Sequence, residues 1–153
     1  MANTYSQIYL HFVIVVKRRQ NLIPREHKEE LHKYISGLVN NRGCKMLAIH
    51  CMPDHTHFFV GFKPAISISD FVKEIKVESN QFINVKGWTK TKFAWQEGYG
   101  VFSYSQSHLT RVINYIRNQE DHHAKKKFSE EYLQLLKKFE ISYEDKYLFE
   151  FFD

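Results

Sequence analysis

The sequence predicts an α+β fold: a ferredoxin-like antiparallel sheet in the order β-α-β-β-α-β, followed by additional C-terminal helices. Runs rich in β-branched and aromatic residues alternate with segments whose apolar residues recur at helical spacing. Two of the strand-like runs are joined by the tight turn Met52-Pro53-Asp54, which predicts a hairpin between two helices. At 153 residues we expect one domain over 1–153, with its core over about 5–122 and a C-terminal helix and docking tail over about 128–153.

The first strand and the first helix have clear boundaries. Residues 5–16 are rich in apolar and aromatic side chains, which predicts a central strand that ends at the three charges of 17–19. We expect His11, within this strand, to be a core or edge histidine. Pro24 suits the first turn of the helix that follows, and Gly43 closes that helix.

The hairpin and the second helix come next. Residues 44–50 and 55–62 are expected to pair, which places the third strand beside the first at the centre of a sheet with one open face. Ser67 has the position of an N-cap, because an acidic residue follows three positions later. The second helix then carries an apolar stripe between Ile68 and Ile83.

The next two elements are less regular. Residues 93–104 predict a fourth strand whose middle is interrupted at Gly98-Tyr99-Gly100. Either Ser105 or Ser107 is expected to cap a third helix, which runs to about His122.

The C-terminal segment is expected to pack on the rest of the domain. Ser129 has the position of a cap for a short last helix. The tail 141–153 carries so much apolar and aromatic surface that we expect it to dock on the domain or on a second subunit.

Composition narrows the class of protein. The net charge of +5 and the aromatic content of 16% favour a polyanionic partner such as nucleic acid. Cys44 and Cys51 have no CxxC spacing, which argues against a disulfide framework and fits a reducing compartment. The N-terminus lacks the features of a signal peptide, and the apolar run 8–16 is too short to span a bilayer. We therefore expect a cytoplasmic protein with no membrane partner.

A pair of histidines begins the third predicted strand. Side chains of a strand alternate between its faces, so His55 and His57 point the same way. Imidazole is the commonest metal ligand in proteins, and the pair therefore predicts half of a metal site. Two alternatives are a purely structural pair and a zinc site that adds Cys44, His50 and Cys51, although that spacing matches no standard zinc pattern.

The third predicted helix carries a tyrosine outside its apolar stripe. Tyr115 lies roughly 110° from the centre of that stripe, on a polar and partly cationic face. It is either a surface tyrosine or a nucleophile activated by a nearby cation or base. Gln119 lies one turn further on the same face, and its amide oxygen can add a third ligand to the two imidazoles. Such a mixed nitrogen and oxygen set suits Mg²⁺ or Mn²⁺.

Basic residues are candidates for binding a nucleic-acid backbone. Such residues are usually solvated, but beside a phosphate-handling site they become candidate phosphate contacts. The candidates are Lys17, Arg18, Arg19, Lys90, Lys92 and Arg111.

Together these motifs resemble the single-tyrosine HUH transposases of the insertion-sequence-200-like kind, including relatives that act on repetitive extragenic palindromes. The resemblance covers most of residues 5–150 and rests on four segments in the same order, namely Tyr9 to Arg19, Met52 to Val60, Trp95 to Ser105 and Val112 to Gln119. There are two departures. Asp54 stands where the family more often has Asn, and Thr56 is polar where a bulky apolar residue is usual.

The resemblance implies a DNA transposase that acts on single-stranded DNA. In this family the tyrosine attacks a phosphodiester and leaves a 5′-phosphotyrosine link and a free 3′-hydroxyl, which allows strand transfer. On this pattern His55 and His57 are metal ligands, Tyr115 is the nucleophile and Gln119 an accessory ligand. The family further implies hairpin, palindromic DNA ends and a homodimer. A non-catalytic, domesticated hairpin DNA- or RNA-binding module remains the alternative, and a small metallohydrolase or zinc-stabilised protein a third.

Overall fold

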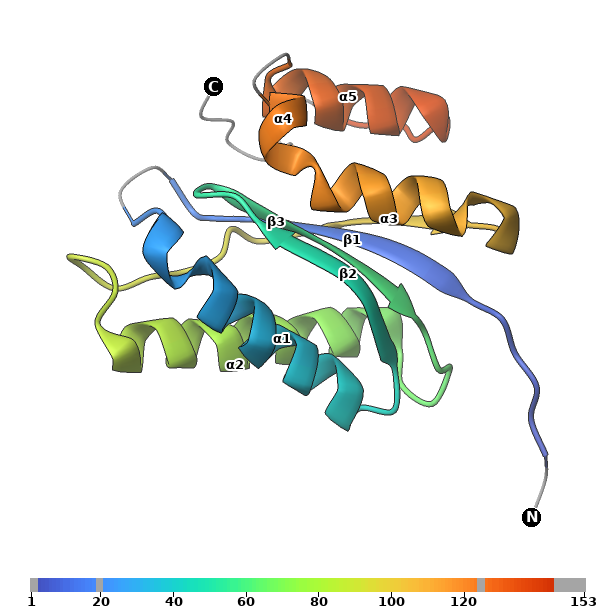
Figure 1. Cartoon of the computed structure of the whole chain (residues 1–153), viewed down its shortest axis with the longest axis horizontal. Helices are drawn as coiled ribbons and strands as arrows, with labels where there is room; N and C mark the ends of the chain where they lie inside the picture. The colour runs from blue at the N-terminus through green and yellow to red at the C-terminus, as the bar shows by residue number, and fades with distance from the viewer. Residues whose placement is uncertain (1–2, 19–20, 124–125, 145–153) are drawn as a thin grey trace.

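The computed structural model describes residues 3–18, 21–123 and 126–144 (Figure 1). Its strands form one antiparallel sheet in the order β2-β3-β1-β4, which is the expected ferredoxin-like arrangement. The elements are β1 (Tyr9–Val15), α1 (Lys28–Asn41), β2 (Lys45–Cys51), β3 (His55–Gly61), α2 (Ile68–Lys86), β4 (Gly100–Tyr104), α3 (Leu109–Arg117), α4 (Gln119–His123) and α5 (Phe128–Lys138), with short 3₁₀ turns before α1 and α3.

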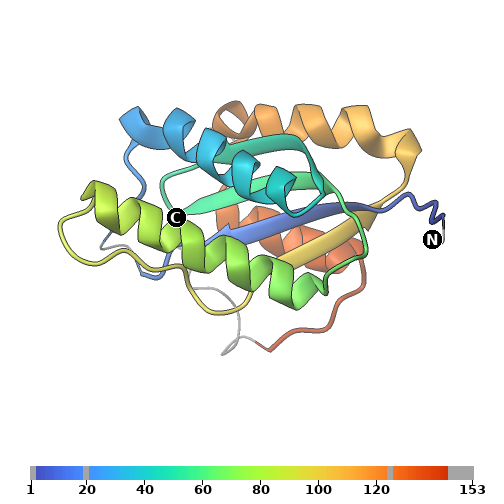
Figure 2. The ribbon, with the colours of Figure 1, turned by 90° about the horizontal axis from the view of Figure 1, so that it is seen from below.

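Helices cover both faces of the sheet. α1 and α2 lie on one face and α3 and α5 on the other, as Figure 1 and the view from below in Figure 2 show. The expectation of an open face is therefore wrong. The reason is the amphipathic stripe of α3, whose Val112 and Ile116 pack on Ala48 and Phe59 of the sheet, while α5 packs beside it.

Alternation along β1 divides the interior into two parts. Phe12 and Ile14 point towards α1 and α2 and belong to the larger hydrophobic cluster. Val13 and Val15 point to the other face, where they pack with residues of α5. His11 lies on the same face of β1 as these two valines, because side chains two residues apart point the same way. The face that α3 and α5 cover therefore includes a buried polar side chain.

Some expected boundaries differ. β4 begins only at Gly100. The preceding segment pairs with the residue that follows β1 through one isolated bridge, Val16 with Trp95. A Cβ at Gly100 would lie 2.7 Å from the Tyr132 hydroxyl and 3.0 Å from its ring, which explains why the strand starts on a glycine packed under α5. The third helix is not continuous to His122, because α3 ends at Arg117 and α4 starts two residues later.

Only one of the expected serine caps forms. The Ser67 hydroxyl accepts a hydrogen bond from the Asp70 amide, as predicted. Ser105 precedes the 3₁₀ turn without a capping bond, since its hydroxyl bonds the side chains of Ser107 and His108 instead. The Ser129 cap is wrong, because α5 already begins at Phe128. Most of the tail 141–153 lies outside the described residues, so its docking stays a prediction.

Candidate active site

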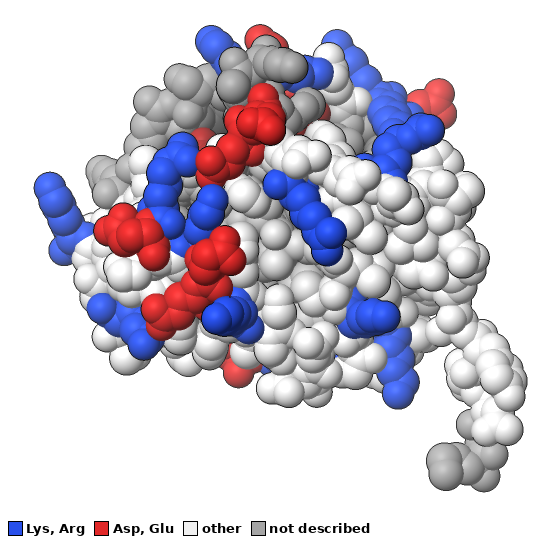
Figure 3. Space-filling model, viewed as in Figure 1, with Lys and Arg blue, Asp and Glu red and all other residues white. Residues whose placement is uncertain are grey.

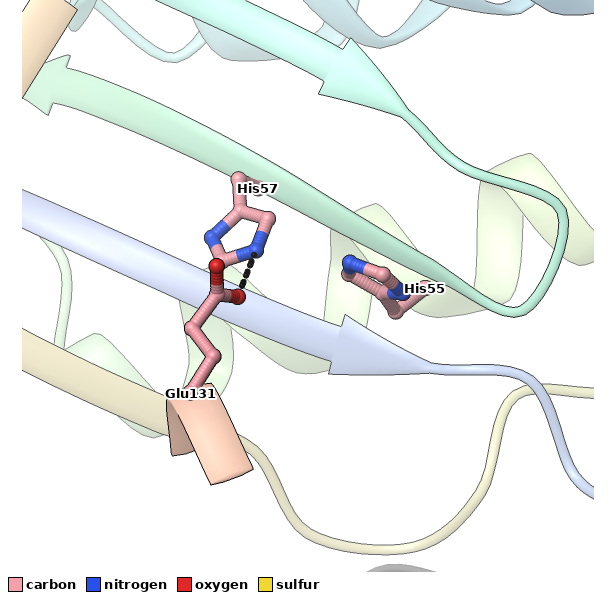
Figure 4. A group of neighbouring side chains, drawn as sticks. All are labelled: His55, His57 and Glu131. Carbon is pink, nitrogen blue, oxygen red and sulfur yellow. Dashed lines mark hydrogen bonds and ion pairs between the residues drawn. The ribbon is translucent and has the colours of Figure 1, made fainter. Parts of the chain in front are cut away.

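The two histidines lie side by side on the covered face of β3. His55 and His57 pair with Val15 and Val13 of β1, and their ring centroids are 5.1 Å apart. Neither ring is exposed to solvent beyond 1%. The strand alternation that brings them to one face therefore also places them under α3 and α5 (Figure 4).

A carboxylate from α5 completes a group of three donors. Glu131 is 3% exposed, and its Oε1 lies 3.1 Å from His57 Nε2. One ligand atom each from His55, His57 and Glu131 lies within 4.8 Å of the others, and Figure 4 shows the carboxylate reaching the histidines from the opposite side of the site. Among the described residues this group has the donors and spacing that a metal ion requires.

Each histidine is oriented by a hydrogen bond at Nδ1. The Nδ1 atom of His55 lies 2.7 Å from Asp54 Oδ1, and Nδ1 of His57 lies 2.7 Å from His11 Nε2. Burial and the neighbouring His57 hold the pKa of His11 well below its usual value, so the His11 ring is neutral and its Nε2 can accept a hydrogen bond from Nδ1–H of His57. Since these contacts occupy Nδ1 of both rings, a metal ion held by the pair would bind at Nε2.

Tyr115 reaches this group from α3 of the same chain. Its ring stands edge-on to His57, with 5.9 Å between centroids, and its hydroxyl hydrogen-bonds the Glu131 carboxylate. Burial is the main cause that raises the pKa of Tyr115, and both the charge of Glu131 and this hydrogen bond raise it further. A hydrogen bond with the Gln119 side chain acts in the opposite direction and lowers the pKa. The phenol is thus held protonated, with a carboxylate in place to take the proton.

Gln119 lies beside the group at the start of α4. The side chain is fully buried, and its Nε2 lies 3.4 Å from the backbone oxygen of Tyr115. Within the described part of the chain, its Oε1 is buried without a hydrogen-bond partner. A buried acceptor without a donor is costly, which fits an oxygen that awaits a cation.

Phe128 closes the site from the α5 side. Its ring stacks on His55 at 3.7 Å between centroids and 9° between planes. Together with Glu131 it places α5 directly over both histidines. The Phe128 ring thus covers His55, and both histidines are closed off from solvent.

The basic residues fall into two groups. The exposed Lys17 and Arg18 follow β1, and the loop with Lys90 and Lys92 is tied to the same segment because the Asn21 side-chain amide donates to the Lys92 carbonyl at 2.9 Å. Arg111 lies apart from them on α3, and Arg19 lies outside the described residues. The structure thus places one group of basic residues beyond the C-terminal end of β1, and Arg111 near Tyr115.

The layer formed by α1 and α2 has a different charge pattern. It contains ion pairs such as Arg42 with Glu74 at 2.9 Å and Lys86 with Glu30 at 3.0 Å. Figure 3 shows acidic and basic side chains intermingled over this part of the surface. Paired charges of this kind leave little positive potential for a polyanion.

Sequence reasoning missed Glu131. An acidic residue in the first turn of a helix is ordinarily a favourable partner of the helix dipole, which hides any other role. The available signal was its position, since Glu131 lies three residues after Phe128 and four before Leu135, on the apolar face of α5. The zinc alternative is not supported, because Cys44 and Cys51 belong to the cluster on the α1 and α2 side.

A ferredoxin-like sheet with a His-x-His strand and a tyrosine helix packed above it defines the class of single-tyrosine HUH transposases. The family model for IS200-like transposases matches residues 4–119, and the chain belongs to this family of single-stranded DNA transposases. α5, with Phe128 and Glu131, lies beyond the matched residues.

Individual relatives agree with this assignment. The chain is 25% identical over 122 residues to the ISDra2 transposase TnpA of Deinococcus radiodurans, covering 75% of this chain and 86% of the relative. It is 23% identical over 124 residues to the transposase for insertion sequence element IS200 of Salmonella typhimurium, covering 78% of this chain and 81% of the relative.

Two solved structures share the fold. A putative transposase from Deinococcus radiodurans matches with a TM-score of 0.58 and 24% identity, over 78% of this chain and 96% of the other. A REP-associated tyrosine transposase bound to a REP hairpin matches with a TM-score of 0.58 and 17% identity, over 80% of this chain and 73% of the other. Among the described residues, the chain forms no helix long and apolar enough to cross a membrane.

Proposed function

We propose that this transposase cleaves and rejoins single-stranded DNA through attack of the Tyr115 hydroxyl on a phosphodiester, with a divalent ion bound by His55 and His57. The observation that carries the proposal is the contact of Tyr115 and His57 with one Glu131 carboxylate, within a single chain. A nucleophile, a proton acceptor and two metal ligands then meet at one point, which is what an activated phenol requires.

The donor atoms suit a small divalent ion. The 3.1 Å between Glu131 Oε1 and His57 Nε2 is close to the separation of about 3 Å between neighbouring ligands around an octahedral ion. Two imidazoles, the Glu131 carboxylate and the buried Gln119 Oε1 form a nitrogen and oxygen set that favours Mg²⁺ or Mn²⁺. When bound, the ion supplies positive charge that polarises the attacked phosphate and eases ionisation of the phenol.

The chain's own residues account for the proton and the leaving group. Glu131 accepts the phenol proton as the bond from Tyr115 oxygen to phosphorus forms and the bond from phosphorus to the 3′-oxygen breaks. The 3′-oxygen leaves as a hydroxyl and the proton held by Glu131 returns to it. Another 3′-hydroxyl opens the phosphotyrosine link when it attacks the phosphorus, as Glu131 takes the proton of that hydroxyl and passes it to the departing phenol oxygen.

The expected substrate is a single strand that ends in a hairpin. A structural relative was solved bound to a REP hairpin, which supports this class of ligand. Lys17, Arg18, Lys90 and Lys92 are proposed to contact hairpin phosphates, together with Arg19, and Arg111 to contact the strand near Tyr115. A homodimer is proposed as well. It is not needed to bring a tyrosine to the histidines, because Tyr115 already contacts His57 of its own chain.

The decisive experiment is covalent capture. Hairpin oligonucleotides from the DNA that flanks the gene, labelled at one end, are incubated with the protein and Mg²⁺ or Mn²⁺. Wild type is expected to form a denaturation-resistant protein–DNA adduct that Tyr115→Phe cannot form. Tyr34→Phe is the matched control, because Tyr34 stacks on Phe82 in the α1 and α2 layer. Hairpin binding without any adduct would instead identify a non-catalytic binding module.

A further inference from the structure

A pocket with a mainly apolar lining and several charged residues opens between α3 and α5, directly beside Tyr115. Its volume is about 310 Å³, and Tyr115 and Glu131 form part of its wall. We infer that this pocket binds one nucleotide of the single strand, the neighbour of the phosphodiester that Tyr115 attacks. The inference rests on the proposed function, since it takes Tyr115 as the nucleophile.

The charges around the pocket complement a phosphate. Arg111 on α3 and Lys126 and Lys138 near the two ends of α5 line it, against the single carboxylate of Glu131. That carboxylate is turned to His57 and the Tyr115 hydroxyl. Arg42 and Lys86 of the α1 and α2 layer form ion pairs with acidic side chains, whereas the side chain of Lys126 bonds the neutral Gln134 side chain. This wall therefore attracts the backbone of a strand.

Aromatic and aliphatic side chains provide a surface for a base. Tyr104, at the end of β4, lines the pocket with Val112 and Leu135. The Tyr104 ring is fixed edge-on by Phe59 and Phe139, and Lys138 Nζ lies 5.4 Å from its centroid. An immobilised ring next to a cation is the arrangement with which proteins stack an unpaired base and hold the adjoining phosphate.

The volume of the pocket limits which ligand it can hold. Its volume lies at the lower end of the range of about 300–1,000 Å³ for small-molecule sites. One nucleotide fits this space and a base pair does not, so the pocket selects a single strand. α5, which forms one wall of the pocket, lies outside the residues matched by the family model.

Binding measurements test the pocket separately from catalysis. The probe is a fluorescein-labelled hairpin oligonucleotide with a single-stranded extension, titrated in EDTA against protein that carries Tyr115→Phe. In this background Lys138→Gln is expected to weaken binding several-fold and to lower the slope of log affinity against log salt by about one. Lys137→Gln is the matched control, because Lys137 is the exposed neighbour outside the pocket.

A second arm locates the nucleotide. Abasic substitutions are placed one at a time along the extension, and one position next to the cleavage point is expected to weaken binding several-fold. Leu135→Trp, which fills the pocket, should make binding insensitive to the abasic substitution at that position. The thermal unfolding midpoint of the Leu135→Trp variant shows whether it is folded. The inference is overturned if Lys138→Gln and Lys137→Gln bind alike, or if no abasic position matters. If wild type still forms the covalent adduct in that case, the proposed cleavage by Tyr115 stands without the nucleotide pocket. If wild type forms no adduct but the pocket variants change binding as expected, the proposed cleavage is refuted and the binding of a nucleotide in the pocket is not.

Discussion

The two faces of the sheet are built from the same strands and serve different ends. Towards α1 and α2, β1 and β3 present Phe12, Ile14, Phe58 and Val60, and the interior there is almost entirely apolar. Towards α3 and α5 the alternate residues of the same strands include His11, His55 and His57, all buried. Period-two alternation thus lets one pair of strands carry the hydrophobic core on one side and the chemistry on the other.

This division has an energetic basis. Buried polar groups are costly unless each finds a partner, and a connected network rigidifies its members. On the α3 and α5 face the contacts form two short chains, one from Asp54 to His55 and one from His11 through His57 to Glu131. The apolar face supplies the stability that allows the other face to hold these groups.

Adjacent residues of β3 give the largest expected contrast. Phe58→Ala removes a fully buried ring from the α1 and α2 side and is expected to lower the free energy of unfolding by about 3–5 kcal/mol. His57→Ala, one residue away, is expected to lower the free energy of unfolding by only about 1–2 kcal/mol but to abolish Mn²⁺ binding. Urea unfolding and Mn²⁺ titration by electron paramagnetic resonance measure both. Equal losses of stability in the two variants would contradict the division between the faces.

Glu131 and its neighbour give the next contrast. Glu131→Gln removes the buried carboxylate and is expected to weaken Mn²⁺ binding by at least about tenfold, whereas the exposed Glu130→Gln should leave it unchanged. Gln119→Ala in the same titration reports whether the amide oxygen is a ligand. An affinity equal to wild type in Glu131→Gln would show that this carboxylate serves only to hold Tyr115 and His57.

These residues also show where sequence reasoning succeeded and where it stopped. The strands, the helices, the Ser67 cap and the common face of His55 and His57 follow from local periodicity, which is encoded within a few residues. The closure of the second face and the approach of Glu131 depend on how α5 folds back on the sheet. That is a tertiary contact 74 residues away from His57, and local patterns carry no information about it.

A smaller effect concerns a buried polar group at the rim of the apolar face. His32 of α1 accepts a hydrogen bond at Nε2 from the Cys51 amide at 2.8 Å, and burial lowers its pKa to about 4. The unfolded chain binds a proton at His32 near pH 6.5, so this contribution to stability is complete above that pH and is lost as pH falls towards 4. We expect a loss of about 1–2 kcal/mol over this interval and a smaller slope in His32→Gln. Identical slopes in urea unfolding would contradict this assignment.

The smallest expected effect is that of Asp54→Asn, which introduces the residue that is more usual in the family at this position. The Asp54 Oδ1 bonds Nδ1 of His55 at 2.7 Å and so fixes the tautomer that leaves Nε2 for the metal. Asp54→Asn keeps an acceptor oxygen at this place and loses only the charge, so Mn²⁺ affinity should fall by a few-fold. Asp54→Ala removes the acceptor and should lower Mn²⁺ affinity by about 10–100-fold, as the loss of a hydrogen-bond partner of a ligating histidine typically does. If both variants bind Mn²⁺ like wild type, the orientation of His55 comes from the Phe128 ring stacked on it, and α5 rather than the turn before β3 holds the first ligand in place.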